Sequence, residues 1–190
     1  EILAEAKLMV SDLNGIAVVA GPGSFTGIRI GIGIAQGLSL SQSIPAIALS
    51  SMAASAMTVM AQIEDDYVLI CRPARENEVY FGAYQTSSAD GVVLIGKEQA
   101  CAVDQINFPG LSSRTAKEWT LVGEDQGHAQ AVAKTIGIPI KRIIIQPKIS
   151  LEQVAKLALL RFESKKETEA AQLKPNYIKE ELDYGTAVRE

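Results

Sequence analysis

The sequence predicts an α/β fold, and three observations support this prediction. Apolar stretches of strand length alternate along the chain with longer stretches of helical periodicity. A seven-residue loop with three glycines, at residues 21–27, joins one such strand, at residues 16–20, to a long apolar helix that reaches residue 40. The composition, with 47% hydrophobic and 21% charged residues, is ordinary for a globular protein.

The glycine-rich loop has two interpretations. Its glycines permit a positive φ or a close backbone approach, and no residue from 21 to 28 is charged, so the following helix N-terminus could accept an anion. A plain tight connection is the alternative, because the spacing matches neither the dinucleotide fingerprint nor the P-loop. The candidate phosphate or nucleotide loop comprises Gly21, Gly23, Ser24, Phe25, Thr26 and Gly27, with Pro22 stiffening the turn and Ser24 or Thr26 as helix cap.

The helix after the loop is apolar around most of its circumference. At about 100° per residue, Ile30, Ile34 and Leu38 form one stripe, and a second stripe runs through Ile28 and Ile32. Either both stripes are buried within one domain, or one packs on the chain's own sheet and the other on a partner helix. The predicted partner interface comprises Met9, Ile28, Gly31, Ile32, Ala35 and Ser39.

The remaining elements follow from apolar periodicity and turn residues. Further strands are expected at residues 44–49, 67–72, 78–84, 92–95 and 119–122, with a hairpin turn at 73–77. Further helices are expected up to residue 13 and at 50–62, 126–136 and 151–162. Residues 164–172 are expected to be solvated, and residues 179–190 to form a flexible tail. The charge-free block that begins at Ile30 ends at Ile63, which predicts domains at 1–65 and 66–175 and a tail at 176–190.

Charge argues against direct nucleic-acid binding. The net charge is −4, and the densest basic cluster in the sequence is Lys165–Lys166, whereas a nucleic-acid binder usually carries a basic stripe. Pro45 and a polar turn interrupt the charge-free block, which therefore predicts two buried helices rather than a membrane span. With no signal peptide recognised, and with Cys71 and Cys101 expected as free thiols, we predict a cytoplasmic protein.

Catalytic groups are scarce in the sequence. The only histidine is His128, and no Ser/His/Asp or Cys/His set can be assembled without it. A single histidine of this kind is more often a surface residue than a base or a metal ligand. We therefore assign no catalytic residue and no metal ligand from the sequence, although a phosphate-binding enzyme remains the alternative because of the glycine-rich loop.

Four segments together resemble the TsaB (YeaZ) family. They are GPGSFTGIRIGIGIAQGL at residues 21–38, IPAIALSSMAA at 44–54, ARENEVYFGAY at 74–84 and PNYI at 175–178. The resemblance implies an actin-like (ASKHA, ribonuclease-H-like) fold with two subdomains. It also implies an N-terminal strand hairpin and a third strand that are missing from this sequence, so we expect the chain to be truncated.

The resemblance implies a function in making threonylcarbamoyladenosine at the tRNA adenosine next to the anticodon. The chain would be a non-catalytic partner that activates TsaD through helix–helix heterodimerisation, with TsaE as a further partner, a homodimer as the alternative assembly and tRNA contacted only indirectly. TsaD is similar in fold but carries an H-x-x-x-H metal motif, where this chain has Ser50 and Ala54.

Other departures from the family pattern argue against nucleotide turnover. Pro73 stands where the family usually has Asp, and Glu124 and Asp125 would repel phosphate. No cofactor is therefore expected to be required. The alternative functions are a weak ADP- or ATP-binding ATPase or kinase and, third, a protease.

Overall fold

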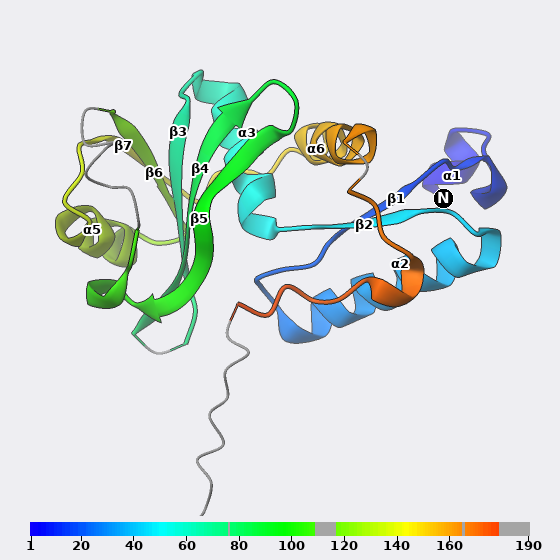
Figure 1. The fold of residues 1–190 in the computed structure, drawn as a ribbon, viewed down its shortest axis with the longest axis horizontal. Helices are drawn as coiled ribbons and strands as arrows, with labels where there is room; N and C mark the ends of the chain where they lie inside the picture. Colours follow the sequence, from blue (N-terminus) through cyan, green and yellow to red (C-terminus); the bar gives the residue numbers. More distant parts are fainter. Residues whose placement is uncertain (76, 109–116, 165, 179–190) are drawn as a thin grey trace, which may run out of the picture.

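The computed structural model describes residues 1–75, 77–108, 117–164 and 166–178. It has a two-stranded and a five-stranded β-sheet, which lie side by side with helices packed on both (Figure 1). The mixed α/β architecture predicted from the sequence is confirmed. The predicted tail at 179–190 lies outside the described residues.

The first unit is built around a parallel strand pair. Its elements are α1 (Ile2–Glu5), a 3₁₀ turn (Val10–Asp12), β1 (Ile16–Val19), α2 (Phe25–Gln42) and β2 (Ala46–Leu49). The next helix, α3 (Ser51–Ile63), leads from this unit to the second. β1 and β2 pair from Ile16 opposite Ala46 to Val19 opposite Leu49. The prediction of a helix up to residue 13 is wrong, because α1 ends at Glu5 and Lys7 adopts a φ of +55°.

The second unit is the five-stranded sheet, in the order β5-β4-β3-β6-β7. Its strands are β3 (Tyr67–Pro73), β4 (Glu78–Ser87), β5 (Gly91–Ala102), β6 (Trp119–Gly123) and β7 (Ile140–Ile145). β3, β6 and β7 run parallel, whereas β4 and β5 form an antiparallel hairpin on the other side of β3. The strand β7 was not predicted, and β5 runs seven residues past its predicted end at Ile95.

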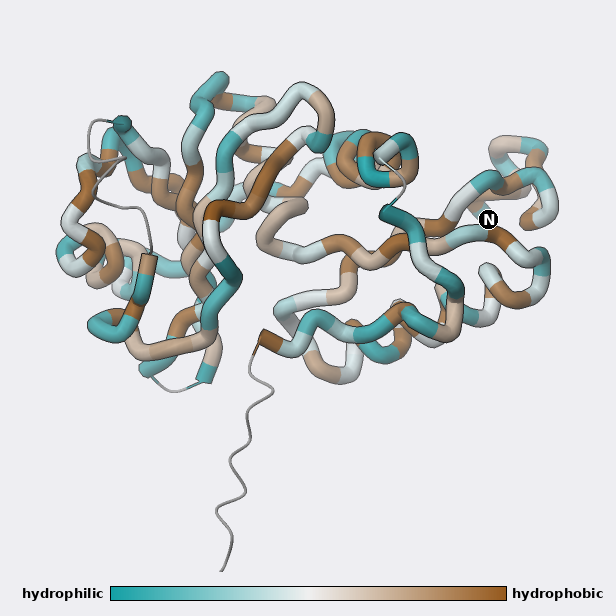
Figure 2. Tube along the Cα trace, in the orientation of Figure 1, coloured by the Kyte–Doolittle hydropathy of each residue, from teal (hydrophilic) through white to brown (hydrophobic). Residues whose placement is uncertain are grey.

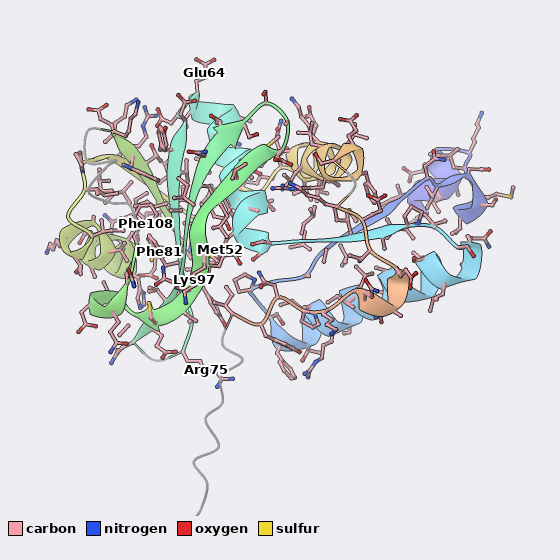
Figure 3. All side chains as sticks on the ribbon, viewed as in Figure 1. Met52, Glu64, Arg75, Phe81, Lys97 and Phe108 are labelled. Carbon is pink, nitrogen blue, oxygen red and sulfur yellow. The ribbon has the colours of Figure 1, made fainter. Side chains whose placement is uncertain are left out.

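Helices cover both faces of this sheet. On one face, α3 and α6 (Leu151–Glu163) enclose a core that includes Met52, Val68 and Leu157. On the other face, α5 (Gln126–Thr135) covers Leu69, Phe81 and Trp119. Figure 3 shows Phe81 next to Phe108 in this second core, where their ring centroids are 6.3 Å apart.

Helix α3 explains much of the long uncharged stretch in the sequence. Nine consecutive residues, Met52–Met60, are buried, so no position on these turns could carry a charge. In Figure 2 the hydrophobic segments gather in the strands and in the helices packed on them, and the hydrophilic segments gather at the connections. No helix in the described part of the chain is long and apolar enough to cross a membrane.

The segment at residues 168–178, which we call the C-terminal strap, returns from α6 to the first unit and runs along α2 (Figure 1). Thr168 and Ala46 exchange two backbone hydrogen bonds, of 2.8 and 3.2 Å, and Asn176 N–H donates to Ala20 O at 2.8 Å. Leu173 is buried in the first unit's core. Within residues 164–172, the described residues are exposed except Ala170, so the structure agrees with the prediction of a solvated segment apart from that residue, whereas the domain division stays a prediction.

Candidate functional site

The site begins with helix α2, which the glycine-rich loop presents. The Ser24 hydroxyl accepts a hydrogen bond from Gly27 N–H at 3.3 Å, so Ser24 is the N-cap. At the other end Ser43 adopts the left-handed conformation, with a φ of 54°, and ends the helix. Between these caps, 18 residues form α2 without any charge except Arg29.

The inner face of α2 is the stripe that was predicted from the sequence to contact a partner helix. Ile32 and Ala35 pack with Ala20, Ala46 and Leu173 in a small core. Ser39 is buried as well, and its hydroxyl donates to the Ile44 carbonyl oxygen. These side chains are buried within the chain, and their assignment to the partner interface stays a prediction.

The other predicted interface residues occupy different surroundings. Ile28 is half-buried and packs on the same small core. Gly31 is also half-buried, and a Cβ there would lie 3.6 Å from Val18. Met9 is 68% exposed at the start of the 3₁₀ turn that contacts α2, so of the six predicted residues it alone is freely accessible.

The outer face of α2 carries the exposed apolar side chains. Ile30 and Ile34 are each 59% exposed, and Leu40 is 67% exposed. Between them lie Gly33 and Gly37, where an added Cβ would find no atom within 4 Å. We call these five residues the outer face of α2. It combines large apolar side chains with a shallow glycine ridge, formed by Gly33 and Gly37. A second helix can pack closely against a surface of this shape.

The loop before α2 is tied to the start of α3. Gly21 O accepts a hydrogen bond from Ser51 N–H at 2.8 Å, and the Ser51 hydroxyl donates to Pro22 O at 2.5 Å. Gly21 has a φ of +108°, and a Cβ there would lie 2.8 Å from Ile28 Cδ1. These contacts account for Gly21 and Pro22 without a ligand, whereas phosphate binding by the exposed residues Gly23 to Gly27 stays a prediction.

An aromatic–guanidinium stack flanks the N-terminal end of α2. The Arg29 guanidinium carbon lies 3.5 Å from the centroid of the Phe25 ring and 5.8 Å from that of Tyr177 in the strap. The sequence analysis did not identify this cluster. The spacing of Phe25 and Arg29, one helical turn apart, could have indicated their contact, but no local signal indicates that of Tyr177.

The positions compared with the H-x-x-x-H motif are occupied by structural groups. Ser50 is the N-cap of α3, and its hydroxyl accepts Met52 N–H at 3.1 Å and Ala53 N–H at 3.3 Å. It also donates to Glu98, which accepts further hydrogen bonds from Tyr84 and from Asn176. Among the residues that the structure describes, no three His, Cys, Asp or Glu side chains are placed to bind a metal ion together.

His128 belongs to the first turn of α5. Asp125 is the N-cap of this helix, and its carboxylate accepts the His128 N–H at 2.9 Å and lies 2.8 Å from Nδ1. The backbone hydrogen bond from His128, which outweighs the effect of burial, lowers the pKa of Asp125. The pair therefore caps a helix.

Comparison with known proteins agrees with this architecture. The family model described as TsaD, tRNA N6-adenosine threonylcarbamoyltransferase, matches residues 1–179. The tRNA threonylcarbamoyladenosine biosynthesis proteins TsaB of Buchnera aphidicola subsp. Schizaphis graminum and of Escherichia coli are 33% and 34% identical to this chain over 124 and 123 residues. Each match covers 65% of this chain and 58% or 52% of the relative, so the chain spans about half the length of the curated relatives it matches.

Solved structures resemble the whole arrangement. YeaZ from Pseudomonas aeruginosa superimposes with a TM-score of 0.78 at 27% identity, covering 92% of this chain and 79% of that one. A second Pseudomonas aeruginosa structure, described as similar to peptidase YEAZ, gives a TM-score of 0.81 at 27% identity over 94% and 79% of the two chains. This chain therefore belongs to the TsaD family of actin-like proteins, and it is similar to the TsaB (YeaZ) tRNA threonylcarbamoyladenosine biosynthesis proteins.

Proposed function

We propose that this chain is a non-catalytic subunit that binds TsaD and activates it in tRNA threonylcarbamoyladenosine modification. The observation that carries the proposal is the outer face of α2, where Ile30, Ile34 and Leu40 are exposed around two glycines. Apolar side chains concentrated on one helix face are typical of a protein–protein contact. Met9 lies near this helix and would extend the contact.

The glycines of α2 add a physical argument. A glycine inside a helix lowers stability by roughly 0.5–1 kcal/mol relative to alanine. Neither Gly33 nor Gly37 has a neighbour within 4 Å of an added Cβ, so packing within the chain does not require them. A partner helix that approaches the backbone closely would require both.

The occupant we propose is a helix of TsaD. Membership of the TsaD family supports this choice, because a relative of the same fold can present an equivalent helix and form a pseudo-symmetric contact. Binding would act on TsaD by stabilising its competent conformation, which needs no active site in this chain. A second copy of this chain is the competing occupant, and TsaE is expected as a further subunit in the cytoplasm, with tRNA bound indirectly because the net charge is −4.

The test measures complex formation by size-exclusion chromatography with light scattering, using the full-length protein and TsaD. The wild type is expected to form a one-to-one complex, and Ile34→Glu to lose it, because a charge would be buried in an apolar contact. Leu151→Glu is the matched control, since Leu151 is 82% exposed on another helix and its variant should still bind.

A second measurement, of TsaD activity, distinguishes binding from activation. Threonylcarbamoylation of tRNA by TsaD is expected to fall in the presence of Ile34→Glu and to remain at the wild-type level with Leu151→Glu. Retention of the complex by a folded Ile34→Glu variant would refute the proposed interface. A self-association that Ile34→Glu abolishes, with no binding of TsaD, would instead identify the second copy as the occupant.

A further inference from the structure

A cavity of about 240 Å³ opens at the carboxyl ends of the three parallel strands β3, β6 and β7. Ile70 of β3 and Val122 of β6, which share one face of the sheet, form its apolar floor, and Ser55 of α3 and Ile149 also line it. None of its residues belongs to α2, so the cavity is separate from the outer face of α2 and from the function proposed for it.

The topology of the sheet places this cavity at a switch point. The chain leaves β3 towards β4 on one side of the sheet, whereas it leaves β6 through α5 towards β7 on the other side. The two connections therefore diverge at the carboxyl ends of β3 and β6, where Arg72 and Gly123 lie. In open α/β sheets, ligands bind in the crevice that such divergence creates.

A guanidinium group and a carboxylate lie next to each other at this cavity. The Arg72 guanidinium makes an ion pair with the Glu124 carboxylate and donates a hydrogen bond to the Ser51 hydroxyl at 3.0 Å. Both side chains line the cavity, and both are partly open to solvent, at 25% and 44% exposure. The pair therefore offers a cation and an anion a few ångströms apart beside an apolar floor.

The Cys71 side chain points away from this floor, into the core on the α5 face of the sheet. Burial, reinforced by the negative charges of Asp125 and Glu124, raises the pKa of Cys71 to about 12. The thiol is therefore neutral at physiological pH and adds no charge near the cavity. The carboxylates at 124 and 125 also disfavour a multiply charged anion such as a phosphate, because Arg72 alone of the lining residues is cationic and Glu124 already pairs with it.

From this geometry we propose that the cavity binds a free α-amino acid with a small aliphatic side chain. The ligand's carboxylate would take the place of Glu124 on the Arg72 guanidinium, its ammonium group would bind the Glu124 carboxylate, and its side chain would lie on the apolar floor between Ile70 and Val122. An ion pair that exchanges partners in this way keeps every charge compensated before and after binding.

The test is isothermal titration calorimetry of the full-length protein with L-valine, isovalerate and isobutylamine, of which the last two each lack one of the charged groups. Saturable binding of L-valine is expected with a Kd of about 1 mM or lower, and binding of either analogue about tenfold weaker or more. Glu124→Gln and Arg72→Gln are both expected to weaken binding of L-valine by a similar factor.

The matched control is Lys141→Gln, which breaks the 2.9 Å ion pair between Lys141 and Asp65 at the opposite end of the same strands. It should leave the affinity for L-valine unchanged. Glu124 is exposed enough for Glu124→Gln to fold, and circular dichroism checks this for each variant. Absence of saturable heat with L-valine, equal affinity for isovalerate, or full affinity in a folded Glu124→Gln variant would each overturn the proposal.

Discussion

Gly33 and Gly37 are the residues of α2 that its own fold explains least. Both lie on the exposed side of a regular helix, where their Cα atoms face open space. Alanine would fit at either position without a clash and would favour the helix. We therefore expect the two glycines to serve a contact with another protein chain.

Gly33→Ala and Gly37→Ala are each expected to raise the free energy of unfolding of the isolated protein by roughly 0.5–1 kcal/mol. Both should weaken TsaD binding, because a Cβ would separate two closely packed helices. Urea denaturation and a binding titration measure the two effects.

The control for this pair is Gly31→Ala on the neighbouring side of α2. Its Cβ would lie 3.6 Å from Val18, an ordinary contact inside the chain, so it should stabilise α2 without affecting the complex. If Gly31→Ala weakens TsaD binding as much as Gly33→Ala, the glycine ridge is not the contact.

At the scale of elements, Asp90 joins the β4–β5 hairpin to α6 and the residues after it. Its carboxylate accepts hydrogen bonds from Lys166 Nζ at 2.6 Å, Arg161 Nη1 at 3.1 Å and Ser164 Oγ at 3.3 Å. The hydrogen bond from Lys166 is the largest influence and, with the charge of Arg161, it lowers the pKa of Asp90 despite partial desolvation. The ionised form is therefore favoured in the folded state.

The sign of the pH effect follows from that direction. Because the pKa of Asp90 is lower in the folded than in the unfolded chain, its stabilising contribution is complete above the unfolded value, about pH 4, and is lost as the pH falls through the folded value. Asp90→Asn is expected to destabilise the protein at pH 7 but to change its stability little at pH 2–3.

Urea denaturation at both pH values measures the difference between Asp90→Asn and the wild type. Asp104→Asn is the control, because it removes an exposed aspartate from the 3₁₀ turn at Val103–Gln105, outside this cluster. An equal loss of stability at both pH values would mean that the charge of Asp90 does not bind the hairpin to α6.

The element most poorly predicted from sequence was β7. Its residues, Ile140–Ile145, contain Lys141 and Arg142 in succession, which breaks the alternation expected of a half-buried strand. An edge strand tolerates such charges, and here both lie near the Asp65 carboxylate. By contrast, β1, β2, α3 and α6 matched their expected ranges within about two residues, because caps and apolar runs mark their ends.

For the candidate site, the sequence predicted the helix but not which of its faces is exposed. A helix that is apolar nearly all round has no polar side to show which stripe faces solvent. Which stripe is buried depends on Leu173, which packs with Ile32 and Ala35 although it lies 138 positions or more further along the chain. A contact between residues so far apart leaves no periodic signal in the sequence. The exposed stripe through Ile30 and Ile34 therefore had to come from the structure.

At the scale of the whole molecule, the C-terminal strap holds the first unit together. Leu173→Ala is expected to lower the free energy of unfolding by about 2–4 kcal/mol, because it removes a buried side chain and leaves a cavity between α2 and β2. Urea denaturation measures this loss. Leu151→Ala, at an exposed position, should change stability by less than about 0.5 kcal/mol, and a similarly small change for Leu173→Ala would show that the strap is not part of the core.

The strap also has a consequence for synthesis on the ribosome. Domains generally fold from the N-terminus as the chain emerges, but here Ala46 and Ala20 meet their partners Thr168 and Asn176 only after almost the entire described sequence has been translated. Until then a nascent chain would lack the cover that Leu173 gives to the inner face of α2, so Ile32 would be more accessible than in the complete fold. Chaperones that recognise apolar helices would thus have their longest access to the helix that we propose as the binding surface for TsaD.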